Sequence, residues 1–158
     1  MYYLGIDPGV SGGMCLLDEY GTVACVGKFK DKTEHDIATL FKDYIKVGSY
    51  GTDGTSGNGF AIIEKVHSMP KQGVASTFKF GRSYGFLRGC LVCNNIPFEE
   101  IAPAKWQREL HCLSKGDKNV TKARAQQLFS SQVERITHYI ADAMLLAEYA
   151  RTMRKGGE

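Results

Sequence analysis

The order in which strand-like and helical segments follow one another most restricts the fold of this 158-residue chain. Residues 2–6, 14–17 and 22–29 are apolar segments separated by short turns that contain glycine, which predicts an antiparallel meander of three strands. A helical pattern over about 33–45 follows, and strands then alternate with helices. This order predicts an α/β fold in one domain, with a mixed sheet and helices on its faces.

Local signals place the later elements. The wholly apolar run 60–63 is typical of a strand buried at the centre of a sheet. Thr33 and Asp36 have the spacing of a helix N-terminal capping box. The other expected elements are a helix over 75–94, an edge strand over 98–101, helices over 104–110, 121–129 and 136–153, and loops over 48–59, 68–73 and 114–119.

Composition excludes several classes of protein. Hydrophobic residues make up 43% of the chain and charged residues 23%, which excludes a disordered or collagen-like chain. No apolar run has the roughly 20 residues that a membrane span needs, so we expect no membrane association. The five scattered cysteines do not suit a secreted disulfide framework. We therefore expect a reducing, intracellular location in the cytoplasm.

Positive charge is concentrated in the middle of the chain. Residues 65–124 hold eleven basic and four acidic side chains, whereas the whole chain has a net charge of +3. This pattern favours a polyanion such as nucleic acid as partner, although a solvated surface is the alternative. The residues expected to contact phosphate are Lys71, Lys79, Lys105, Lys115, Lys118, Lys122 and Arg124.

Three acidic residues are placed where carboxylates perform chemistry. Asp7 and Glu64 follow apolar strands directly, and Asp142 lies in a helix whose other residues are small or apolar. A turn for Asp7 and a solvated or Lys65-paired Glu64 are the alternatives. His138 precedes Asp142 by one helical turn, so it is a candidate metal ligand or base. Hard oxygen ligands without a cysteine cluster suit two Mg²⁺ or Mn²⁺ ions per site.

The motifs resemble, in order and over nearly the whole chain, the RuvC family of Holliday-junction resolvases in the ribonuclease H-like superfamily. The segments that carry the resemblance are 5–9, 61–66, 80–85, 102–106 and 141–143. Compact sequences of this kind resemble phage-type members, and the resemblance implies that residues 1–158 form one ribonuclease H-like nuclease domain. It implies a homodimeric crossover junction endodeoxyribonuclease that resolves four-way and other branched DNA by paired cuts, in the host cytoplasm if a phage encodes it.

The resemblance also implies roles for individual residues. Family members bind metal through four carboxylates, of which Asp7, Glu64 and Asp142 match three. Tyr139 stands at the fourth position, so the neighbouring His138 is the expected substitute as metal ligand and catalytic residue. The family tends to carry a base-stacking aromatic residue three positions after the second acid, where this chain has His67, an expected DNA contact.

Other interpretations stay open at this stage. Gly81, Gly85 and Gly89 recur every four residues in a predicted helix, which indicates close packing either on the domain's own sheet or on a second subunit. The alternatives to a junction resolvase are a ribonuclease H-like nuclease acting on RNA or RNA–DNA hybrid, and a junction-binding protein without catalysis. A nucleotide-binding domain of the actin or sugar-kinase type would need more chain.

Overall fold

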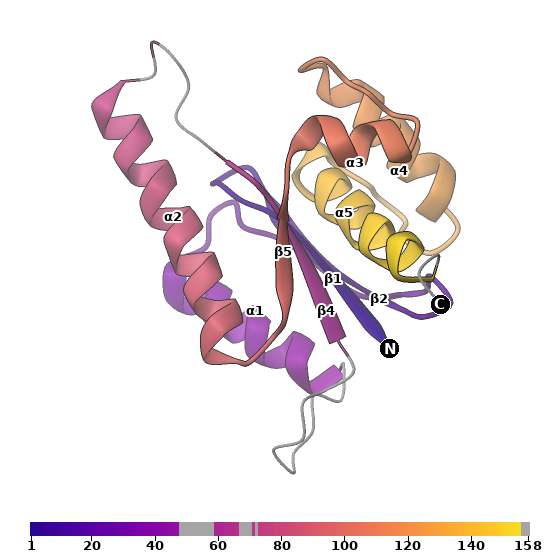
Figure 1. Ribbon diagram of the computed structural model, residues 1–158, viewed down its shortest axis with the longest axis horizontal. Helices are drawn as coiled ribbons and strands as arrows, with labels where there is room; N and C mark the ends of the chain where they lie inside the picture. The colour runs from indigo at the N-terminus through magenta and orange to yellow at the C-terminus, as the bar shows by residue number, and fades with distance from the viewer. Residues whose placement is uncertain (48–58, 67–70, 72, 156–158) are drawn as a thin grey trace.

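The protein was analysed as a computed structural model that describes residues 1–47, 59–66, 71 and 73–155 (Figure 1). A five-stranded sheet in the order β3-β2-β1-β4-β5 forms its centre. The strands are β1 (Tyr2–Asp7), β2 (Gly13–Asp18), β3 (Val23–Lys28), β4 (Gly59–Glu64) and β5 (Phe98–Ile101). All five lie where the sequence predicted strands.

The sheet is mixed, as predicted. β1 pairs antiparallel with β2, and β2 pairs antiparallel with β3, so the first three strands form the meander. β4 runs parallel to both β1 and β5. Because β1 and β4 are parallel neighbours, their carboxyl ends meet at one edge of the sheet, and Asp7 and Glu64 are the last residues of these two strands.

Two layers of helices cover the sheet (Figure 1). The helices are α1 (Glu34–Val47), α2 (Val74–Cys93), α3 (Pro103–Glu109), α4 (Lys118–Phe129) and α5 (His138–Lys155). α1 and α2 lie on one face, and α3, α4 and α5 lie on the other (Figure 1). The predicted capping box starts α1: the Asp36 amide donates to Thr33 Oγ1, and the Thr33 amide donates to Asp36 Oδ2.

Two expected boundaries need comment. α4 begins at Lys118, three residues before the predicted start at 121, because the Asp117 side chain accepts a hydrogen bond from the Asn119 amide and caps the helix. The predicted loops over 48–59 and 68–73 lie largely outside the described residues.

Within the described residues, no helix is long and apolar enough to cross a membrane. All five cysteines belong to the described residues and are free thiols. Cys90 packs against a core, whereas Cys93 faces solvent near the end of α2.

α5 packs directly against the central strand. A Cβ atom at Gly5 would overlap the Ala143 carbonyl oxygen and the Ala147 amide nitrogen, so glycine is required for this approach. Nearly every side chain of α5 between residues 140 and 150 is buried. The core on this face includes Trp106, which has no exposed surface.

α2 differs because one of its faces has no partner within the described chain. A Cβ atom at Gly81, Gly85 or Gly89 would meet nothing within 4 Å. The interpretation that these glycines pack on the domain's own sheet is therefore wrong. Large apolar side chains continue the same face, and Val74 is 87% and Phe78 71% exposed. We call this face the α2 stripe; its members are Val74, Phe78, Gly81, Gly85, Gly89 and Val92.

Candidate active site

Three carboxylates from distant parts of the chain gather at one edge of the sheet. Asp7 ends β1, Glu64 ends β4, and Asp142 lies in the second turn of α5. Strand alternation turns Asp7 and Glu64 toward the face that α5 covers. Asp7 is 6% and Asp142 7% exposed. The sequence therefore identified the acidic residues that the fold buries at this edge.

The carboxylates interact electrostatically. Burial raises the pKa of Asp7 well above its usual value, and the neighbouring negative charges of Glu64 and Asp142 raise it further. Burial also raises the pKa of Glu64 to about 7, with a smaller contribution from Asp142. Asp142 thus makes ionisation of both Asp7 and Glu64 harder, and Glu64 does the same for Asp7. A cation placed among them would relieve this repulsion.

Lys118 is the cation that the chain itself places there. Its Nζ lies 3.4 Å from Asp142 Oδ2. Burial disfavours the charged ammonium, but Asp7, Asp142 and Glu64 together outweigh burial and raise the pKa of Lys118. Lys118 is the first residue of α4. The start of this helix, which the sequence predicted three residues too late, therefore positions the amine.

Trp106 orients Glu64. Its Nε1–H donates a 2.8 Å hydrogen bond to Glu64 Oε2, and this bond opposes the rise in the pKa of Glu64. The indole is fully buried in α3, so it cannot turn away from the carboxylate. Sequence reasoning noted Trp106 within segment 102–106 but gave it no role. A single tryptophan near basic residues carries no signal for a partner 42 residues earlier in the chain.

The donor set suits a hard divalent cation. All three acids offer carboxylate oxygens, and Asp142 Oδ1 is buried with no hydrogen-bond partner among the described residues. However, no group of three or more His, Cys, Asp or Glu side chains in the described part of the chain stands ready to hold a metal ion. The acids are thus gathered around a lysine. Their residue types suit Mg²⁺ or Mn²⁺, but their present arrangement is not that of a ready metal site.

Two hollows flank the carboxylates and share Glu64 and Lys118 as lining residues. One, of about 430 Å³, reaches Asp142 and the 114–116 loop. The other, of about 310 Å³, reaches Asp7 and the turn that follows β1. An extended ligand can therefore pass on either side of the acids.

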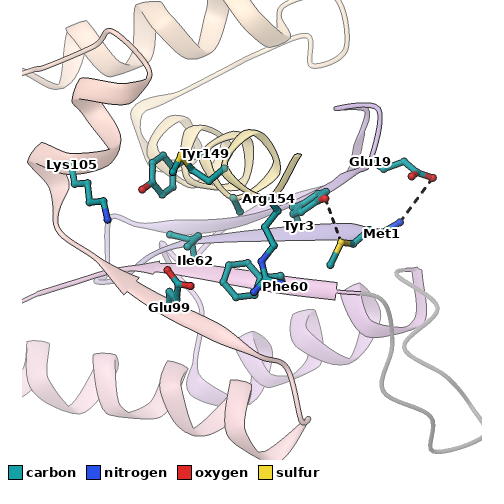
Figure 2. Close-up of a pocket in the computed structure, with 11 residues that line it drawn as sticks. Met1, Tyr3, Glu19, Phe60, Ile62, Glu99, Lys105, Tyr149 and Arg154 are labelled. Atoms are coloured by element: carbon teal, nitrogen blue, oxygen red, sulfur yellow. Dashed lines mark hydrogen bonds and ion pairs between the residues drawn. The ribbon is translucent and has the colours of Figure 1, made fainter. Parts of the chain in front are cut away.

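A larger hollow than these two lies elsewhere, at the starts of β1 and β4 beneath the end of α5 (Figure 2). It measures about 650 Å³. Arg154 and Phe60 both line this hollow, and the Arg154 guanidinium lies 3.7 Å from the centre of the Phe60 ring (Figure 2). Lys105 of α3 and Glu99 of β5 also line it (Figure 2). Because none of the three buried acids reaches this hollow, size alone does not mark the reactive site.

The predicted phosphate contacts do not all surround the carboxylates. Lys115 and Lys118 line the 430 Å³ hollow. Lys79 lines a separate hollow of about 280 Å³ on α2, and Lys105 faces the large hollow of Figure 2. The structure thus distributes the predicted cations over more than one surface.

The remaining predicted contacts have varied surroundings. Lys71 is exposed, and Lys122 is half-buried on α4. Arg124 supports the fold: its Nε donates a 2.9 Å hydrogen bond to the Leu110 carbonyl oxygen. His67 lies outside the described residues.

His138 is not joined to the three acids. Its ring is exposed and packs on the Tyr139 ring, with 4.0 Å between the ring centres. No hydrogen bond or ion pair within the described residues connects His138 to Asp7, Glu64 or Asp142. Its role as a fourth ligand stays a prediction.

No protein-family model matches the chain, and no curated protein matches it in sequence. Among solved structures, RuvC of Thermus thermophilus in complex with a Holliday junction substrate matches with a TM-score of 0.71, covering 99% of this chain and 97% of that one. A further Thermus thermophilus RuvC structure matches with a TM-score of 0.61 and the same coverage. This chain has the fold of RuvC.

The similarity to RuvC extends over the whole fold but little of the sequence. Both structures are 15% identical to this chain. The expected ribonuclease H-like fold, with an antiparallel meander followed by parallel strands, is therefore confirmed. Sites and chemistry have to be argued from this chain's own residues.

Proposed function

We propose that this protein is a metal-dependent endonuclease that cuts four-way and other branched DNA by paired hydrolysis of phosphodiester bonds. The observation that carries the proposal is the gathering of Asp7, Glu64 and Asp142 around Lys118 at one sheet edge. Neighbouring acids that are buried or partly buried are costly unless a cation or a proton balances their charge. The RuvC fold, solved elsewhere with a Holliday junction, supports branched DNA as the substrate.

Asp7, Glu64 and Asp142 would hold two Mg²⁺ or Mn²⁺ ions. Such ions, when bound, supply an activated water and stabilise charge on the phosphate. Asp7 is held in place because its strand pairs on both sides. Trp106 keeps Glu64 in one orientation, and Lys118 balances negative charge at the site and lies within reach of a phosphate in either flanking hollow.

The test is a cleavage assay on a synthetic four-way junction with added Mg²⁺ or Mn²⁺. Asp7→Asn should lower the cutting rate by roughly a thousandfold or more, the scale expected when a central catalytic group is removed, while junction binding persists. Asp43→Asn, an exposed acid on α1, is the matched control and should cut like the parent. Unchanged cutting by Asp7→Asn would rule out the mechanism. Faster cutting of an RNA–DNA hybrid than of the junction would move the substrate to the hybrid class.

His138 is tested separately as the fourth ligand. If it binds metal, His138→Ala should lose most Mn²⁺-supported cutting, and His138→Asp should retain or raise cutting with Mg²⁺. Parent-like activity of His138→Ala would leave a site of three carboxylates. The exposed position of the ring makes this experiment decisive for the ligand set.

We further propose that two copies associate through the α2 stripe. Its glycines leave room for another helix to approach closely, and its exposed Val74 and Phe78 would be covered in a dimer. A two-fold dimer would supply two sites for paired cuts. Light scattering on the parent tests this arrangement, and a monomer at micromolar concentrations would contradict it.

A junction-binding protein without catalysis is the second candidate. Two observations favour it: no ready metal group stands among the described residues, and Tyr139 occupies the position where the family resemblance implies a fourth acid. The assay above separates the two functions. Tight junction binding by the parent, with no cutting under Mg²⁺ or Mn²⁺, would establish the binding protein.

A further inference from the structure

A second group of positive charges lies beside the carboxylates, on the side of β3. In the segment that ends this strand, Phe29 is 3% exposed and turns into the core beneath α1. Alternation therefore turns Lys28 and Lys30 to the opposite face, where α5 begins. We call the surface formed by Lys28, Lys30, His138 and Tyr139 the β3 patch.

Tyr139 holds both lysines of the β3 patch. Lys30 Nζ donates a 3.1 Å hydrogen bond to the Tyr139 hydroxyl and lies 5.1 Å from the ring centre. Lys28 Nζ lies 6.0 Å from the same ring centre. Neither lysine forms an ion pair in the described portion of the chain, although Asp31 follows Lys30 directly. Two exposed ammonium groups thus lie near one aromatic ring, and their positive charges are available to bind a ligand.

The sheet register places the β3 patch close to the carboxylates. Asp7 pairs with Gly13, and Gly13 pairs with Lys28, so two strand spacings of about 4.8 Å separate Asp7 from Lys28. α5 closes over the strand between them, since a Cβ atom at Gly13 would come within 2.7 Å of the Tyr139 carbonyl oxygen. Lys118 lies among the acids, and the β3 patch adds two further cations beside them.

We propose that Lys28 and Lys30 bind backbone phosphates of the DNA strand that passes over the carboxylates, with Tyr139 as the residue that positions the two amines. The inference rests on the proposed function, since the strand to be cut defines the path. Roughly 10 Å separates Asp7 from Lys28 along the sheet, so the phosphate bound by the β3 patch lies within a few nucleotides of the cut.

The salt dependence of junction binding tests the contact. In the non-cutting Asp7→Asn background, the double variant Lys28→Gln, Lys30→Gln should lower the slope of log affinity against log salt by about two. Between 50 and 200 mM salt, the parent background should lose about tenfold more affinity than the double variant. The matched control is Lys42→Gln, Lys46→Gln, which removes two exposed charges from α1 on the other face and should leave the slope unchanged.

Neutral methylphosphonates placed one at a time along the cut strand locate the contact. A neutral linkage at one position within a few nucleotides of the cut should weaken binding in the Asp7→Asn background but not in the double variant. If both proteins respond alike at every position, or the slope does not change, the β3 patch is not a phosphate site. Absence of junction binding by the parent would overturn this inference and the proposed function together. Binding without cutting would overturn the nuclease and keep the contact.

Discussion

α5 and α2 have similar lengths, 18 and 20 residues, and both place small residues along one face, yet they use those residues oppositely. On α5, Ala143 and Ala147 let the helix lie directly against Gly5 of the central strand. On α2, a Cβ atom added at Gly81 or Gly85 would meet no other part of the described chain within 4 Å. A small-residue stripe therefore marks where backbones can approach, and the surrounding topology decides whether the partner belongs to the same chain.

The largest effect should come from adding one methyl group under α5. Gly5→Ala places a Cβ atom into the backbone of Ala143 and Ala147, so the helix must shift and its core must loosen. We expect a loss of about 4 kcal/mol or more in the free energy of unfolding, measured by urea denaturation. Gly89→Ala on α2 is the control and should not destabilise. A cost of less than about 1 kcal/mol for Gly5→Ala would mean that α5 moves freely on β1.

Metal binding should stabilise the protein through Asp142 of α5, by less than the loss expected for Gly5→Ala. α5 carries Asp142 into the carboxylate cluster, whereas the α2 stripe contains no charge. Mn²⁺ at a hundred times its dissociation constant should raise the free energy of unfolding by about 2.7 kcal/mol, read from thermal melts. The shift should shrink strongly in Asp142→Asn and persist in Gly85→Leu. An equal shift in Asp142→Asn would place the ion elsewhere.

A large side chain on the α2 stripe should break the dimer and spare the fold. Gly85→Leu enters open space within the chain, so the monomer keeps its structure, but a second helix can no longer approach. We expect the dimer dissociation constant to rise at least tenfold, about 1.4 kcal/mol, in sedimentation experiments. Lys42→Leu on α1 is the control for added apolar surface. A Gly85→Leu protein that dimerises like the parent would exclude this face as the interface.

The smallest effect should be a gain. Gly85→Ala, measured at a concentration where the protein is monomeric, should raise the free energy of unfolding by about 1 kcal/mol because alanine favours the helix and meets no neighbour. The same substitution at Gly5 is expected to do the opposite. A loss of stability for Gly85→Ala would reveal a contact within the chain at that face.

Much of the fold could be predicted from the sequence because local patterns agreed with one another. The apolar run 60–63 became a strand buried at the centre, and Thr33 with Asp36 capped α1. The start of α4 was missed because the Asp117 cap precedes three residues that look like loop. The glycines of α2 were noticed, but a stripe of glycine does not say which partner approaches it.

The candidate site was only partly predictable. Asp7, Glu64 and Asp142 stood out because each is a charge in apolar surroundings. His138 was assigned to the face of Asp142 from spacing alone, yet it is the first residue of α5 and its ring lies on Tyr139 in solvent. Trp106 and Lys28 act across large separations in sequence, and no local pattern predicts such contacts.

The close approach of α5 to Gly5 has a consequence for biosynthesis. The helix that covers β1 leaves the ribosome more than a hundred residues after this strand. Until then Tyr3 and Leu17 expose an apolar surface that invites aggregation or chaperone binding. Asp142 also arrives with this helix, so a nascent chain lacks one of its three acids. Any activity that needs all three begins only when the late helix docks on the early strand.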